Sequence, residues 1–156
     1  MNTRTGVIAI TLLVGIATFL LTRVIWPDTA GGPEPTGTQL LLFIVLGVAD
    51  SLLFGLGVAF LIYGLPLVQR LAPRASALAW LTYLSIAFQL LSWWPHSNFH
   101  RVAGENLGAI LAIDYAFHVP LQLGALIIAT FFVTVAREAL QARQVAARPA
   151  PGLVGA

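Results

Sequence analysis

The chain contains no cysteine and no lysine, and only 9% of its residues are charged. The absence of cysteine excludes disulfides, thiolate metal sites, iron–sulfur clusters and a cysteine nucleophile. The absence of lysine excludes a glycine-rich phosphate loop of the usual kind, so we expect no nucleotide, and the scattered arginines offer no nucleic-acid surface. Soluble proteins are roughly 25% charged. A chain with so few charges cannot cover a water-facing surface, so we expect lipid to be its solvent.

What the sequence has instead is long apolar runs. A helix needs about 20 apolar residues to cross the hydrocarbon core of a bilayer. Four stretches meet this length, each bounded by helix breakers or charges: residues 6–26, 39–67, 76–94 and 107–136. The sequence therefore predicts an all-α integral membrane protein, a four-transmembrane-helix bundle within a single membrane domain of residues 1–137. Residues 138–156 are predicted to form a flexible cytoplasmic tail.

The arginines predict the orientation of these spans, because cytoplasmic segments carry an excess of basic residues. Arg23 and Arg101 fall at one side of the predicted membrane, and the other six fall at the opposite side: Arg4, Arg70, Arg74, Arg137, Arg143 and Arg148. Both termini are therefore predicted to be cytoplasmic (N-in/C-in). The use of arginine without lysine is typical of bacteria with GC-rich genomes, so the predicted location is the inner (plasma) membrane. The first stretch ends in Arg23 and Trp26 and is longer than a signal-peptide core, which favours an anchor.

Each span has one face of small or polar residues at helical spacing. In the first two spans these are mostly glycine and threonine, such as Thr11, Gly15 and Gly55, which we interpret as positions of close helix packing. In the third span the polar face reaches His96 if the helix continues through Pro95. Lipid cannot satisfy polar groups. We therefore expect the four faces to meet in the interior of the bundle.

The ionisable residues within the spans are harder to attribute to packing. An aspartate at the centre of a membrane helix costs roughly 2.5–3.5 kcal/mol, so it requires a partner. At about 1.5 Å per residue, Asp50 and His118 lie at a similar depth near mid-membrane, with Asp114 one turn above and the other histidines at the outer mouth. This predicts an Asp50–His118 pair in an outward-facing polar pocket, whose other members are Gln89, Ser92 and Gln122.

The histidines give the sharpest motif, because His96 and His100 are four residues apart and so are Asp114 and His118. On a helix this spacing aims two side chains at one point, as metal ligation requires. We predict that these four residues bind a divalent metal such as zinc. An open coordination position would make the protein a metal-dependent membrane hydrolase, with Asp50 and Ser51 as candidate catalytic residues that orient a water or an oxyanion.

Three alternatives stay open. The first is a non-enzymatic membrane structural or partner-binding subunit in which Asp50 and His118 form a buried pair. The second is a proton or ion pathway, although the inner half of the chain offers few polar relay groups. The third is a haem protein with His118 and an outer histidine as axial ligands, which the predicted difference in their depth disfavours. The expected partners are the lipid bilayer and either a second copy of the chain or another membrane protein.

Overall fold

The computed structural model describes residues 2–27, 35–71 and 76–146. These residues form helices joined by short connections, and no strand occurs among them. The helices are, in chain order, α1 (Thr3–Ile25), α2 (Gly37–Leu71), α3 (Ser76–Ala103), α4 (Leu107–Ile113), the π-helical turn η1 (Asp114–His118) and α5 (Val119–Ala146). The last three follow one another without a break. Helices α1, α2, α3 and the combined α4–η1–α5 are each long and apolar enough to cross a membrane.

Three helices extend beyond their predicted ends, and the first of these is α2, which runs to Leu71 where residue 67 was predicted. Helix α3 continues through Pro95 to Ala103, past the predicted boundary at residue 94. Proline removes only one helical hydrogen bond, and the polar residues that follow it here keep the helical conformation. Helix α5 continues to Ala146, so residues 138–146 are helical where a flexible tail was predicted, because this segment is rich in the helix formers alanine, glutamine, arginine and glutamate. Residues 147–156 lie outside the described residues.

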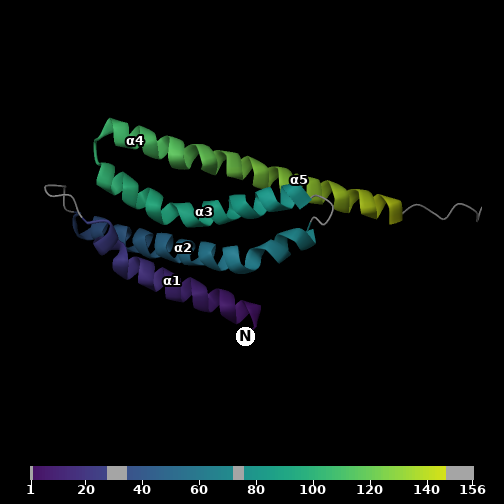
Figure 1. The fold of residues 1–156 in the computed structure, drawn as a ribbon, viewed down its shortest axis with the longest axis horizontal. Helices are drawn as coiled ribbons and strands as arrows, with labels where there is room; N and C mark the ends of the chain where they lie inside the picture. The colour runs from purple at the N-terminus through teal and green to yellow at the C-terminus, as the bar shows by residue number, and fades with distance from the viewer. Residues whose placement is uncertain (1, 28–34, 72–75, 147–156) are drawn as a thin grey trace, which may run out of the picture.

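The helices lie side by side in a row (Figure 1). Helix α1 packs on α2, α2 on α3, and α3 on α5, whereas α1 and α5 make no comparable contact. Near one end α1 also reaches α3, where Trp94 Nε1 donates to Thr22 Oγ1 at 3.0 Å and Arg101 donates to the Trp26 carbonyl oxygen at 2.6 Å. The polar faces are therefore distributed over successive interfaces. They do not meet in the single interior expected from the sequence.

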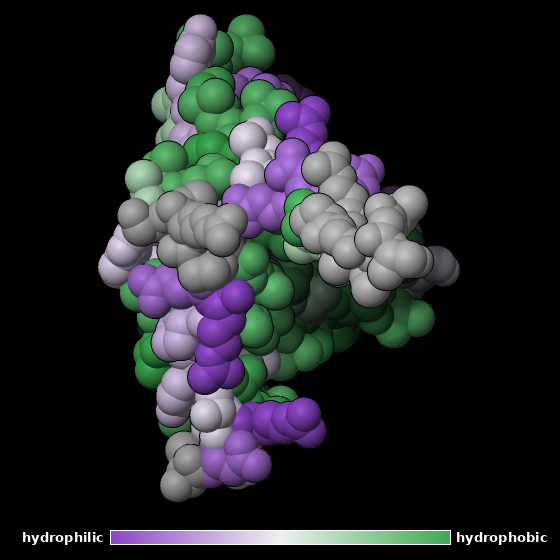
Figure 2. Space-filling model, turned by 90° about the vertical axis from the view of Figure 1, so that its right-hand side faces the viewer, coloured by the Kyte–Doolittle hydropathy of each residue, from purple (hydrophilic) through white to green (hydrophobic). Residues whose placement is uncertain are grey.

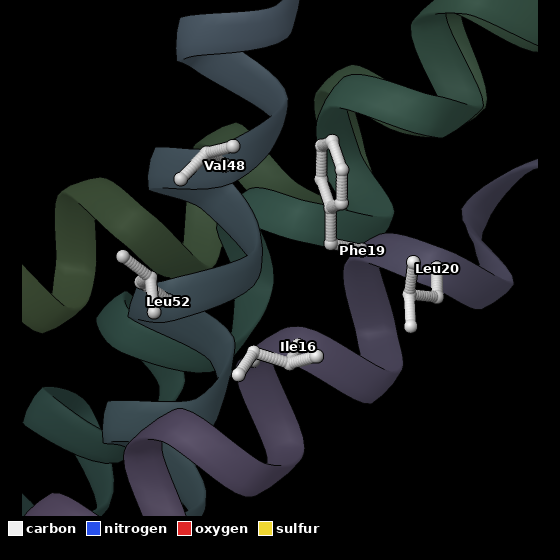
Figure 3. Close-up of a pocket in the computed structure, with 6 residues that line it drawn as sticks. Ile16, Phe19, Leu20, Val48 and Leu52 are labelled. Atoms are coloured by element: carbon white, nitrogen blue, oxygen red, sulfur yellow. The ribbon is translucent and has the colours of Figure 1, made fainter.

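Helices α1 and α2 approach each other most closely at two glycines. A Cβ atom on Gly55 would overlap with the Thr11 carbonyl oxygen of α1, and one on Gly15 would lie 3.1 Å from the Ser51 carbonyl oxygen of α2. This confirms the interpretation of Gly15 and Gly55 as packing positions. Beside the crossing is a small apolar hollow of about 130 Å³, which Figure 3 shows between the side chains of Phe19 and neighbouring aliphatic residues.

A compact apolar cluster of α2, α3 and α5 lies toward the end of the molecule where α2 ends and α3 begins. It consists of Val68, Ala79, Tyr83 and Phe131. Figure 2 looks at this end, where hydrophilic residues gather while hydrophobic residues cover the flanks. Large apolar side chains are exposed along all the helices, including Leu107 at 81%. Soluble monomers rarely expose apolar patches larger than a few hundred Å², so this surface suits a lipid environment.

Candidate metal centre

Two of the three histidines lie one turn apart on α3, directly after Pro95. The continuation of the helix through this proline keeps His96 and His100 at a spacing of four residues. Their Nε2 atoms lie 3.0 Å apart. The prediction that this spacing aims both imidazoles at one point is therefore confirmed.

The third histidine is supplied by η1. In this turn the N–H of Val119 donates to the carbonyl oxygen of Asp114, five residues earlier, and Pro120 has no N–H to restore the α-helical pattern. The wider turn still holds Asp114 and His118 together, with His118 Nδ1 2.8 Å from Asp114 Oδ1. Single π-helical turns are uncommon and occur frequently at functional sites.

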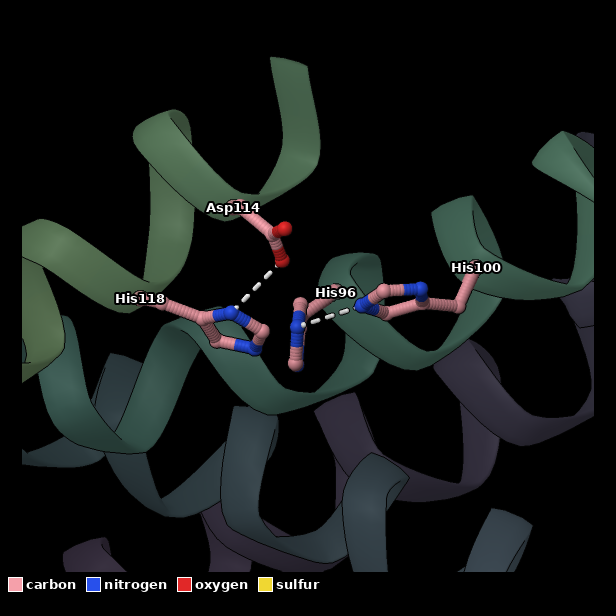
Figure 4. A network of polar contacts seen from close by, with 4 residues as sticks. All are labelled: His96, His100, Asp114 and His118. Carbon is pink, nitrogen blue, oxygen red and sulfur yellow. Dashed lines mark hydrogen bonds and ion pairs between the residues drawn. The ribbon is translucent and has the colours of Figure 1, made fainter. Parts of the chain in front are cut away.

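The three imidazoles form a histidine cluster between α3 and η1 (Figure 4). The ring centroid of His96 lies 4.7 Å from that of His100 and 4.7 Å from that of His118. One nitrogen from each ring lies within 4.8 Å of the other two. Zinc–nitrogen bonds of 2.0–2.1 Å in tetrahedral geometry place ligand nitrogens about 3.3 Å apart. Small rotations of the side chains would therefore bring all three nitrogens to one ion.

Asp114 contacts the cluster through His118. A carboxylate on Nδ1 holds the Nδ1–H tautomer and leaves the Nε2 lone pair for a metal, which is the usual outer contact of a ligating histidine. Asp114 was predicted as a metal ligand. In this arrangement its contact is with His118, so it is positioned to orient that ligand.

The cluster has one apolar wall and one open side. His96 is only 9% exposed, and its ring packs against Phe117 at a centroid distance of 5.3 Å and against Trp93 at 6.2 Å. The side chains of His118 and Asp114 are 42% and 44% exposed. An ion held here would therefore be shielded from water by aromatic rings on the side of His96 and accessible from the side of η1.

The candidate catalytic residues, Asp50 and Ser51, do not belong to the histidine cluster. Within the described parts of the chain, Asp50 accepts a hydrogen bond from the Ser97 side chain, and His118 pairs with Asp114, so the predicted Asp50–His118 pair is wrong. Successive residues on a helix point about 100° apart. Ser51 accordingly faces α1, and its buried Oγ has no hydrogen-bond partner in the described structure. Asp50 and Ser51 thus do not converge on one point.

The other predicted pocket residues also have separate environments. Gln89 Nε2 donates to the Leu121 carbonyl oxygen at 2.6 Å and so joins α3 to α5. Ser92 is buried and donates to the Gln89 carbonyl oxygen within α3, while Gln122 is exposed.

The predicted depths are corrected as well. His96 and His100 were placed at an outer mouth, with His118 deeper, because the third span was ended at residue 94. Since α3 runs on to Ala103, the first two histidines lie within the helix and at the level of the third.

An apolar groove beside the cluster was missed by the sequence analysis. It has a volume of about 590 Å³ and lies between the end of α3 and the α4–η1 segment. Among its lining residues are Phe99, Ala109, Ala112, Ile113 and Phe117. Ala109 and Ala112 are three residues apart, so their small side chains leave a hollow on one face of the helix. Alanine is also common at positions of helix packing, so this spacing alone does not predict a groove.

Comparison with known proteins gives no relative for this chain: no family model, no curated protein and no solved structure matches it.

Proposed function

We propose that this chain is a multi-pass membrane protein that binds a divalent first-row metal ion, with zinc as the preferred ion. The observation that carries this proposal is the presence of three imidazole nitrogens from two helical segments within 4.8 Å of one another. Imidazole suits zinc, copper, iron and nickel. Ionisable residues in membrane helices are costly and are retained where they act, and three clustered imidazoles exceed what helix packing requires.

Each residue of the site has a distinct task in this proposal. His96, His100 and His118 donate the nitrogen ligands, and Asp114 fixes the tautomer of His118 through the 2.8 Å contact. Phe117 packs on His96 and keeps water from one side of the ion. A drier site strengthens electrostatic interactions with the bound ion.

Three nitrogen ligands leave a tetrahedral ion with an open fourth position. This is the pattern of catalytic zinc sites, whereas structural sites have a closed set of four protein ligands. A zinc ion held by His96, His100 and His118 would supply the Lewis-acid chemistry of metal-assisted ester or amide hydrolysis. Hydrolysis of a lipid-like ester or amide is therefore the reaction class that we propose. The open side at His118 is the direction from which water and substrate would approach.

The proposal is tested by metal analysis of the protein purified in detergent. We expect close to one zinc or cobalt ion per chain, and a cobalt absorption spectrum typical of tetrahedral nitrogen coordination. The variants His96→Ala and His118→Ala should each lose stoichiometric binding. Asp50→Asn serves as a matched control. It also neutralises an aspartate within a helix, but the Asp50 side chain bonds Ser97 and does not contact the cluster. Substoichiometric metal that does not change in either histidine variant would falsify the proposal.

We propose that the protein lies in the plasma membrane of a bacterium and that both of its termini are in the cytoplasm. Arg4, Arg70, Arg137 and Arg143 all lie toward the end of the molecule where α2 ends and α3 begins, while Arg23 and Arg101 lie toward the other end. A similar bias sets the orientation of many membrane proteins. A periplasmic reporter fused after residue 148 should be inactive and a cytoplasmic one active. The reverse result would overturn the N-in/C-in assignment.

A further inference from the structure

The groove beside the histidine cluster is apolar almost throughout. Helix α3 contributes Phe99 and Val102 to one wall, and α4 contributes Ala109 and Ala112 to the other. The one polar residue of its lining is Asn106, whose Oδ1 atom already accepts a hydrogen bond from the Ala109 N–H. The volume of about 590 Å³ falls in the range of small-molecule sites, roughly 300–1,000 Å³. The part of a ligand that lies in this groove is therefore expected to be apolar.

The groove and the histidine cluster share a wall. Phe117 lines the groove, and its ring packs against His96 at 5.3 Å and against Phe99 at 5.8 Å. In η1, Phe117 and His118 are consecutive, so the segment that presents a ligand nitrogen to the ion also presents an aromatic ring to the groove. One elongated molecule could therefore extend along the groove and reach the ion past the edge of Phe117.

We propose that the groove holds the acyl chain of a lipid-derived amphiphile whose oxygen-bearing head binds the metal ion. This inference rests on the proposed function and deepens it by naming the substrate class. The charges fit such a head: a divalent ion on three neutral imidazoles beside one carboxylate retains a net positive charge, which favours a carboxylate or a polarised carbonyl oxygen. The groove itself lies in segments that belong to candidate membrane spans, so an acyl chain enters it directly from the bilayer.

The proposal is tested with the full chain in lipid nanodiscs, loaded with cobalt. The probes are lauroyl hydroxamic acid and acetohydroxamic acid, which share a metal-binding head and differ in the tail. Binding is followed by the change in the cobalt absorption spectrum. The variants Ala109→Trp and Ala112→Trp fill the groove from α4. Leu111→Trp is the matched control, because Leu111 is exposed on the same helix and does not line the groove.

We expect both groove variants to bind cobalt and acetohydroxamic acid as the unmodified protein does, and to lose at least tenfold in affinity for lauroyl hydroxamic acid. Leu111→Trp should retain the affinity for both probes. Partition of the long-chain probe into the bilayer is the same for every variant, so the ratio between variants reports on the groove. Equal affinities for the lauroyl probe in all variants would overturn the assignment of the groove and leave the metal site standing. Failure to bind cobalt at all would instead contradict the proposed function.

Discussion

Polar groups are accommodated differently at two contacts of the molecule. One is the contact between α1 and α2, and the other is the contact between α3 and η1. In the first, the close approach is made by glycines, and the carbonyl oxygen of Thr11 on α1 lies directly against Gly55 on α2. In the second, imidazoles from two segments contact each other, and the nearest carboxylate bonds one of them. Small and hydroxylated residues thus serve packing at one interface, while ionisable residues converge at the other.

The energetic difference between these interfaces supports a functional reading of the second. A glycine or threonine in a membrane helix requires no partner outside its own helix, whereas a buried ionisable residue is disfavoured by a few kcal/mol unless it is paired. Three histidines at one place are more than a helix interface needs for register. Changes at the first interface should therefore alter stability alone, and changes at the second should alter ligand binding.

The largest effect on stability is expected from Gly55→Ala. The added Cβ overlaps with the Thr11 carbonyl oxygen, so α1 and α2 must separate, at a cost of about 1–3 kcal/mol as for other overpacked sites. Gly47→Ala is the control, because its Cβ would meet only Phe19 at an ordinary distance of 3.6 Å. Thermal unfolding followed by circular dichroism in detergent compares the two. Equal midpoints for Gly55→Ala and Gly47→Ala would show that the crossing does not depend on the glycine.

Lowering the pH should weaken metal binding about a hundredfold or more between pH 7.5 and pH 5.5. Only neutral imidazole binds a metal, so protons compete with the ion for the three ring nitrogens as the pH falls. Competition titrations with a chelator of known pH dependence measure this change. An affinity that is constant across this range would exclude histidine ligands.

Asp114→Asn should reduce the metal affinity by about 10–100-fold without abolishing binding, as is typical when the outer partner of a ligating histidine is replaced. The asparagine can still accept a hydrogen bond from His118 Nδ1, but it no longer offers a charge to strengthen the ligand. Asp50→Asn should leave the affinity unchanged, because Asp50 bonds Ser97. A complete loss of binding in Asp114→Asn would instead indicate that this carboxylate is a direct ligand, as the sequence analysis predicted.

The smallest effect is expected from Thr22→Val. It removes the acceptor for Trp94 Nε1, and hydrogen bonds between membrane helices contribute about 0.6 kcal/mol on average. Thr130→Val is the control, since that hydroxyl bonds only the Leu126 carbonyl oxygen of its own helix. If both substitutions lower the unfolding midpoint equally, the hydrogen bond between Trp94 and Thr22 does not contribute to stability. Metal affinity should be unchanged in either variant.

The sequence was sufficient to predict four helices and the convergence of His96 with His100, because both depend on local patterns. The length of the apolar runs predicts the helices, and the spacing of His96 and His100 depends only on whether the helix continues past Pro95. The presence of a proline does not decide this question, since a helix can lose one hydrogen bond and continue. The contact of His118 with these residues comes from the packing of α3 against η1.

Other features could not be read from the sequence because they depend on the rotation and packing of whole helices. Pro120 indicates a local break in the helical hydrogen bonds but does not predict a π-helical turn, and Gln122 beyond the turn is exposed. The prediction for Asp50 used depth alone. The structure shows that this residue faces Ser97 on α3, so a similar depth did not imply contact. Ser51 was assigned with Asp50 by sequence adjacency, and adjacent helical residues diverge.

The π-helical turn also separates two halves of one long candidate membrane span, Leu107–Ala146. Before the turn, α4 is positioned by its short connection to α3. After it, α5 is positioned by the close approach of Gly124 to Gln89, whose side chain bonds the Leu121 carbonyl oxygen. Each half has its own attachment to α3, so a change of residues on one side of the turn need not shift the other. The groove wall formed by α4 can therefore vary in sequence while α5 keeps its packing against α3 unchanged.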